Sequence, residues 1–364
     1  MRPPGGGRLL LAGSLLGAGL VGAALAQGPV ETPAPATPPS PVSREEDNAR
    51  WISLLAAVNK LSPEQQSQVE AIVTDSHWMG TGNPAVTVHP LSPEQCRANL
   101  AQAGQTWQKA EDFEVCGSPF MAPLYDPATQ SAKDATTCID RLEFPGIPCE
   151  YPVVWVRAKE AEELCRAIGK RLCDAHEWEG GCQGELGPAD YRFDLARGVG
   201  ASTAVNRMRD AHNRAYRATA RWSYGPEFRT GVCAQSSSKT SGCTGGSWTG
   251  CGSNTYPAGS FPDCQSPLGV GDINGNAAEH MNLPLAPDQM ASAGTRLGVT
   301  EMKGSWFIWD KYRAHEDWCR WRAPYWHGGP VMAADSHHNY HLGFRCCKDV
   351  GAPAAATPAL LENP

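Results

Sequence analysis

The chain has 364 residues, a length that suits two or three ordinary domains and excludes a small peptide scaffold. Its 38 glycines, its 30 prolines and a charged fraction of only 19% predict much irregular structure and few long surface helices. Because the formal net charge is -7 and no run of lysine or arginine occurs, the sequence argues against nucleic acid as the principal ligand.

The first 26 residues carry an export pattern. An apolar run from Leu9 to Ala26 follows two arginines and ends in Ala24-Leu25-Ala26, the small-x-small pattern that a signal peptidase cleaves. We therefore expect residues 1–26 to be a removed signal peptide. The alternative is an uncleaved anchor, because a run of this length can just span a bilayer. The mature protein is expected to be secreted or periplasmic, without a stable membrane anchor.

The segments beyond the signal differ in composition. Six prolines among small and polar residues predict an extended linker over 27–48, and an Ala- and Pro-rich composition predicts a disordered tail over 350–364. Helical spacing of apolar residues predicts a helical N-terminal segment over 49–115. Within it, the sequence Leu-Ser-Pro-Glu-Gln starts a helix at 61–65 and recurs at 91–95. The recurrence indicates either a short duplicated helical unit or, as we favour, one capping solution used twice.

Fourteen cysteines lie between Cys96 and Cys347. An even number of cysteines in an exported chain indicates a set of disulfides, although the connectivity cannot be deduced from sequence. Two local pairs suggest themselves from spacing alone. One joins Cys165 to Cys173 across a predicted turn, and the other joins Cys243 to Cys251.

Local patterns become specific from residue 138 onward. The apolar run 151–156 predicts a strand, and apolar residues at helical spacing over 161–168 predict a helix that ends at Gly169. A capping box at 174–177 then starts a second helix, which leads into Trp178.

The order of these motifs resembles the formylglycine-generating enzyme family, also called the sulfatase-modifying-factor domain. Residues 256–262 resemble its "PVGSFPPN" turn, 269–279 resemble "GLYDMxGNVWEW", and 304–306 with 342–346 resemble "GGSW" and "GFR". The resemblance covers 116–349. It implies an α+β, irregular and loop-rich variant of the C-type-lectin-like fold, stabilised by disulfides. Ala278 and His280 stand where the family has tryptophans, so the aromatic packing around that loop is expected to differ.

A calcium site is one implication of the resemblance. The family binds Ca²⁺ at positions that correspond here to the side chains of Asp272 and Glu279 and the carbonyls of Gly275 and Ala277. Such an all-oxygen set suits this hard cation. The alternative is a solvated turn in which Glu279 bonds to backbone amides. The family's second calcium site has no matching ligands in the cysteine-rich stretch 233–251.

The catalytic implication fails at one residue. The family binds Cu(I) between two cysteines spaced C-x4-C and uses O₂ to convert a substrate cysteine to formylglycine. Soft thiolates select Cu(I), but here Cys319 is followed five residues later by Pro324, which offers no ligand. We therefore expect no copper to be bound and Cys319 to be half of a structural disulfide. The family also pairs the cysteine after "GFR" with one after "EWE", which implies a bond from Cys182 to Cys346.

Aromatic and histidine residues near the C-terminus suggest a binding surface. Tryptophans beside arginines bury large areas and stack well, and the family places its substrate groove here, although ordinary core packing is the alternative for any one ring. Histidines 337 and 341 could bind a metal if they lay on a helix, but their neighbours predict a loop. The residues expected to line the groove are Trp306, Trp318, Arg320, Trp321 and Arg322.

Together these patterns predict a non-catalytic accessory module that binds a peptide, protein or glycan. The alternative is a copper- and O₂-dependent oxidase that matures sulfatases by using Cys319 with a non-standard partner. A weaker third hypothesis is a non-haem metal enzyme centred on the histidines.

Overall fold

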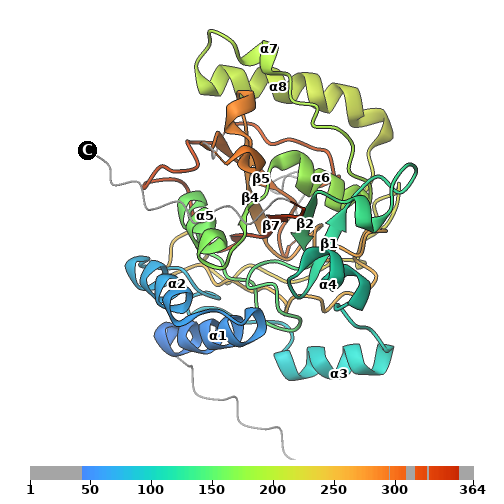
Figure 1. The fold of residues 1–364 in the computed structure, drawn as a ribbon. Coiled ribbons are helices and arrows are strands. Elements are labelled where there is room, and N and C mark those ends of the chain that lie inside the picture. The colour runs from blue at the N-terminus through green and yellow to red at the C-terminus, as the bar shows by residue number, and fades with distance from the viewer. Residues whose placement is uncertain (1–42, 295, 309–315, 326–327, 352–364) are drawn as a thin grey trace, which may run out of the picture. The chain divides into compact units, whose positions relative to one another are not determined.

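The computed structural model describes residues 43–294, 296–308, 316–325 and 328–351 (Figure 1). The expected signal peptide, most of the linker and most of the C-terminal tail lie outside these residues. Among the residues described, no helix is both long and apolar enough to cross a bilayer.

The N-terminal segment is helical, as predicted. It contains α1 (Arg44–Asn59), α2 (Pro63–Asp75), α3 (Pro93–Ala103) and α4 (Ala110–Cys116). The expected end of the linker at residue 48 is wrong, because α1 begins at Arg44. The hydroxyl of Ser43 accepts from the backbone N–H of Glu46, whose carboxylate accepts from the N–H of Ser43. The acidic residues of that first turn also stabilise the positive end of the helix dipole.

The helix starts predicted at the two repeated sequences are confirmed. The Ser62 and Ser92 hydroxyls each accept from the backbone N–H three residues later, at the first turns of α2 and α3. Helices α1 and α2 pack into a core shared with the later chain, where the ring of Trp51 meets Phe144 edge-on at 5.8 Å. The helical segment therefore belongs to the same folded unit as the chain that follows it.

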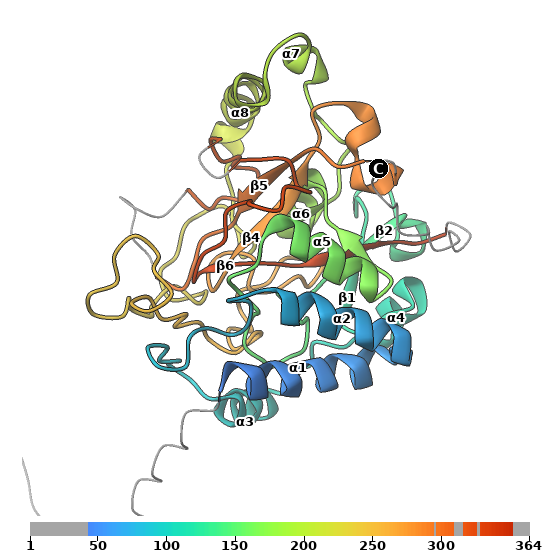
Figure 2. The same ribbon diagram turned by 90° about the vertical axis from the view of Figure 1, so that its left-hand side faces the viewer.

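Two small sheets form the centre of this unit (Figures 1 and 2). One has the antiparallel strand order β1-β2-β7-β3. In the other, of order β5-β4-β6, β4 runs antiparallel to β5 and parallel to β6. The strands are β1 (Met121–Leu124), β2 (Thr137–Asp140), β3 (Arg171–Leu172), β4 (Ala278–Leu283), β5 (Val299–Lys303), β6 (Leu342–Phe344) and β7 (Cys346–Asp349).

Helices connect and cover the sheets. Helix α5 (Ala158–Ala167) forms as predicted and is followed by Gly169 at a φ of 74°, a left-handed conformation that favours glycine. The remaining helices are α6 (Ala175–Gln183), α7 (Phe193–Ala196), α8 (Ala201–Tyr216) and the 3₁₀ turns η1 (Ala132–Asp134), η2 (Arg217–Thr219), η3 (Pro287–Gln289) and η4 (Ala291–Ala293). The fully described stretch 220–277 has neither helix nor strand beyond isolated bridges. The predicted α+β class with much irregular structure is confirmed.

The strand predicted over 151–156 does not form. Val154 makes only an isolated bridge with Gly80, and Val153 donates to the carbonyl of Phe144. Trp155 adopts a φ of 60°, which takes the backbone out of the β region. The apolar residues are buried as a β-rich pattern suggests, but in an irregular segment.

All fourteen cysteines lie in the described residues and form seven disulfides, which indicates an oxidising extracellular environment. The predicted Cys243–Cys251 bond is confirmed. The other bonds are Cys96–Cys149, Cys116–Cys138, Cys165–Cys346, Cys173–Cys347, Cys182–Cys319 and Cys233–Cys264.

Two expected pairs are therefore wrong, Cys165–Cys173 and Cys182–Cys346. Strand β3 pairs with β7, and adjacent residues of β7 belong to different cores because successive side chains of a strand point to opposite faces. Cys346 lies in the core with Cys165, whereas Cys347 lies in the core with Cys173. Each of the adjacent cysteines thus meets a different partner.

Candidate functional site

Cys319 is a buried structural cysteine. Its sulfur is bonded to that of Cys182 on α6, and neither residue is exposed to solvent. The expectation that Cys319 is half of a disulfide is confirmed. Its partner, which the sequence left open, is Cys182. Because every cysteine of the chain is paired, no thiolate pair is present to bind Cu(I).

A buried ion network lies around this disulfide, anchored on Glu179 of α6. One of its oxygens accepts from Lys303 of β5 at 2.6 Å and from Arg322 at 2.9 Å. Arg322 also donates to Asp190 at 3.0 Å, and Arg320 donates to the other oxygen of Asp190 at 2.8 Å. Oppositely charged groups with this geometry neutralise one another in a medium of low polarity.

The network shifts the titration of its acids. Burial by itself raises the pKa of Glu179, but the charges of Arg322, Lys303 and His212 outweigh it and hold the pKa well below its usual range. The pKa of Asp190 is likewise lowered, since hydrogen bonding to His212 and the arginine charges outweigh burial. Both carboxylates are therefore ionised partners of the surrounding cations.

The predicted groove residues divide into two groups. Trp306, Trp318 and Arg322 are almost fully buried, so the prediction that they line a groove is wrong. Arg320 stacks on the ring of Tyr216 of α8, with 3.6 Å between guanidinium carbon and ring centre. These four side chains are engaged in contacts within the protein and are not positioned to meet a ligand. Trp321 is the member of the predicted set that lines an open groove.

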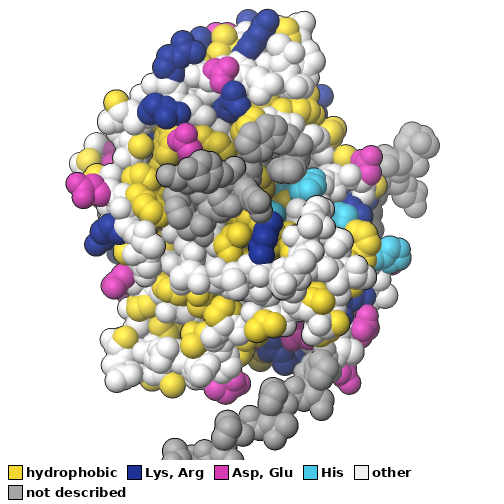
Figure 3. All heavy atoms as spheres, turned by 180° about the vertical axis from the view of Figure 1, so that it is seen from behind, with side chains coloured by type: hydrophobic (Ala, Val, Ile, Leu, Met, Phe, Trp, Pro, Cys, Tyr) yellow, Lys and Arg dark blue, Asp and Glu magenta, His cyan; other side chains and the backbone are white. Residues whose placement is uncertain are grey.

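That groove lies along α8 and has a volume of about 530 Å³. The side of the molecule formed by α7 and α8 gathers arginine side chains, which share the dark blue colour of basic residues in Figure 3. No residue of α8 was among the predicted groove residues, although the spacing of residues 210, 213, 214 and 217 places them on one helix face. The groove is lined by Arg209, Asp210, Asn213, Arg214, Arg217, Trp321 and Pro324.

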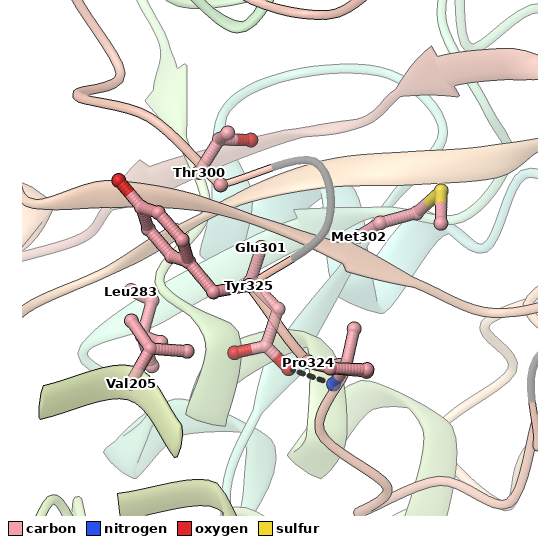
Figure 4. Close-up of a pocket in the computed structure, with 9 residues that line it drawn as sticks. Val205, Leu283, Thr300, Glu301, Met302, Pro324 and Tyr325 are labelled. Carbon is pink, nitrogen blue, oxygen red and sulfur yellow. Dashed lines mark hydrogen bonds between the residues drawn. The ribbon is translucent and has the colours of Figure 1, made fainter. Parts of the chain in front are cut away.

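Pro324 also lines a second, enclosed cavity of about 10 Å³, the space of a single water molecule (Figure 4). Glu301 of β5 accepts from the backbone N–H of Ala323 through one oxygen. Its other oxygen turns toward Val205 of α8 and has no hydrogen-bond partner. A water molecule fits this position, but a substrate does not.

The residues expected to bind calcium lie beside Glu143 and Arg345. Glu143, Asp272 and Glu279 are nearly fully buried and face one guanidinium. Both oxygens of Glu279 accept from Arg345, at 2.6 and 2.7 Å, and one also accepts from Trp178. The alternative in which Glu279 bonds to backbone amides is therefore wrong.

Asp272 still has a spare oxygen. Its Oδ2 accepts from the backbone N–H of Gly259, whereas its buried Oδ1 has no partner. Burial raises the pKa of Asp272 to about 6 and, with the charges of Asp272 and Glu279, raises that of Glu143 well above its usual value. Gly275 has a φ of 128°, and a side chain there would meet the carbonyl of Ala234. Asp272 and the glycine backbone fit a cation, whereas Glu279 as oriented does not.

The histidines near the C-terminus lie in irregular chain, as predicted, so His337 and His341 do not share a helix face. Within the described residues, a metal-compatible group forms instead at Glu179, Asp190 and His212. The cations of the ion network already neutralise its carboxylates. A second such group consists of Cys173, Glu177 and Cys347, but its two cysteines are bonded to each other and so offer no thiolate.

Comparisons with known proteins give little further information. No protein-family model matches the chain, and a search of curated proteins finds no match. A solved structure described as the crystal structure of CarF is 15% identical, covering 71% of this chain and 84% of that chain, with a TM-score of 0.26. A similarity this weak supports no conclusion about fold or activity.

Proposed function

We propose that this protein is an exported, non-catalytic member of the formylglycine-generating enzyme family that binds a peptide or glycan in the groove along α8. The ordered motifs over 116–349 support the family, and the disulfides support export. The observation that carries the non-catalytic role is the buried Cys182–Cys319 bond. It leaves Cys319 without a thiol, while Pro324 removes the second sulfur.

The rival function is the copper-dependent oxidase. It would require reduction of the Cys182–Cys319 bond and a second sulfur from elsewhere in the chain, which conflicts with seven complete pairs. Purified protein is incubated with Cu(I), O₂ and a peptide that carries the family's C-x-P-x-R sequence, and the peptide mass is measured. We expect an unchanged peptide. Conversion of its cysteine thiol to an aldehyde would refute the non-catalytic role.

Ligand binding is tested at Trp321. Replacing Trp321 with Ala is expected to weaken binding of a groove ligand at least tenfold, because an indole contributes much of the buried area in such sites. The matched control is Trp78→Ala, since Trp78 is an exposed tryptophan that does not line the groove. A panel of oligosaccharides and peptides is screened by calorimetry. Equal loss in both variants would contradict a site at the groove.

We also propose that Asp272, with the backbone around Gly275, binds Ca²⁺ as a structural ion. The support is the unpaired buried oxygen of Asp272 and an excess of buried carboxylates over the single guanidinium of Arg345. A cation there would neutralise this excess and would require Glu279 to share its oxygens between Arg345 and the ion.

Removing calcium measures directly how much the ion contributes to stability. At a hundredfold excess over its Kd, Ca²⁺ is expected to stabilise the wild-type protein by about 2.7 kcal/mol, seen as a rise in Tm of several degrees relative to chelator. Asp272→Asn should abolish this increment, whereas Asp263→Asn, which alters an exposed acid on the same loop, should retain it. Identical Tm values with calcium and with chelator would exclude the ion.

A further inference from the structure

We propose that the groove along α8 binds an acidic oligosaccharide, one whose pyranose rings carry carboxylate or sulfate groups. This inference rests on the proposed binding function and specifies the ligand of the same site. It is carried by the charge of the groove, by the way its two sides are fixed, and by the nature of its apolar surface.

The charge of this region is opposite to that of the chain. Residues 192–219 contain six arginines and two aspartates, whereas the whole chain has a net charge of -7. Arg214 is exposed, and none of the described residues forms an ion pair with it. Arg217 is 66% exposed and contacts Glu316 only at 3.4 Å, and such exposed pairs contribute little. Two guanidinium groups are therefore available to an anion.

The two sides of the groove are tied together. The side-chain amide of Asn213 donates to the carbonyl of Arg322 at 3.0 Å and accepts from its backbone N–H at 2.9 Å. One turn away, Arg320 stacks on Tyr216. These contacts fix α8 against the segment that carries Trp321 and Pro324. The binding surface is thus organised before a ligand arrives, which reduces the entropy that binding must overcome.

The lining favours a sugar over a peptide. Peptides are usually held by adding a strand to a sheet edge or by an extended apolar groove, and the described lining is one helix face with a single indole and a proline. An indole beside proline offers a flat apolar surface for the C–H face of a pyranose. Guanidinium groups bind carboxylate and sulfate through two parallel hydrogen bonds. The combination fits an acidic sugar.

The inference is tested by calorimetry with four probes of similar length: a sulfated heparin hexasaccharide, hexagalacturonate, neutral chitohexaose and hexaglutamate. We expect the acidic sugars to bind and the affinity to fall as salt increases. The double variant Arg214→Gln/Arg217→Gln should weaken binding at least tenfold. The control Arg229→Gln/Arg296→Gln removes the same charge from exposed arginines outside the groove and should bind like wild type.

Each other outcome overturns the inference in a recognisable way. Equal binding of chitohexaose would show that charge is not recognised, and equal binding of hexaglutamate would show an acidic-peptide site. Binding that both double variants lose equally would reflect overall charge instead of the groove. If none of the probes binds, the acidic-sugar inference fails, while the non-catalytic role is still judged separately by the peptide oxidation assay.

Discussion

Replacing Glu179 with Gln is expected to reduce the free energy of unfolding by about 3–5 kcal/mol. The amide would remove the anion that the buried ammonium of Lys303 and the buried guanidinium of Arg322 share, leaving Lys303 with Glu301 at 3.2 Å and Arg322 with Asp190 at 3.0 Å. Denaturant unfolding under non-reducing conditions measures the change. As a control, Glu185→Gln alters an exposed carboxylate just after α6 and should cost less than about 0.5 kcal/mol.

The same variant has a defined pH dependence. Because the pKa of Glu179 is lowered in the folded protein, its ionised form stabilises the fold above the ordinary carboxyl pKa, and this contribution is lost as the pH falls further. The difference in stability between wild type and Glu179→Gln should therefore be full at pH 7 and shrink below about pH 4. A loss below 1 kcal/mol at pH 7, or a difference that grows on acidification, would contradict the ion network.

Removing the Cys182–Cys319 bond by a double Ala substitution is expected to cost about 4 kcal/mol. The two cysteines are 137 residues apart, but the Cys173–Cys347 bond already shortens the path between them and so reduces the entropic gain. The same substitution at Cys243 and Cys251, which are only 8 residues apart, should cost about 2–3 kcal/mol.

Both double variants keep the remaining cysteines paired, so Tm and denaturant midpoints can be compared directly. Equal costs would mean that the loop closed by the bond does not determine its contribution. Copper-dependent oxidation of the test peptide should not increase after removal of the Cys182–Cys319 bond, since neither cysteine remains to bind copper. An increase would contradict the non-catalytic role.

Features set by a few neighbouring residues could be predicted from the sequence. The caps at Ser62 and Ser92 depend on a hydroxyl and an N–H three residues apart, and the end of α5 depends on Gly169. Whether residues 151–156 form a strand could not be predicted from neighbouring residues alone. A β-rich pattern specifies burial, but a ladder also needs an extended partner and extended dihedral angles, which Trp155 lacks.

Most of the candidate site could not be predicted from the sequence, because it depends on contacts between residues far apart in the chain. The cluster of tryptophans and arginines near residue 320 is visible in the sequence, and Trp321 does line the groove. The sequence does not reveal that Arg322 meets Glu179, 143 positions earlier, and is buried by that ion pair. The pairing of β3 with β7 is equally distant, so the local Cys165–Cys173 pair looked favourable although the fold excludes it.

The placement of Cys346 and Cys347 has a consequence for how the chain matures. Their partners, Cys165 and Cys173, emerge 181 and 174 residues earlier during synthesis, before the last strand exists. During that interval the two early thiols are only eight positions apart and are each other's nearest reaction partners. Correct oxidation must therefore wait for the C-terminus or pass through an exchange step, and a disulfide isomerase would accelerate the production of native protein.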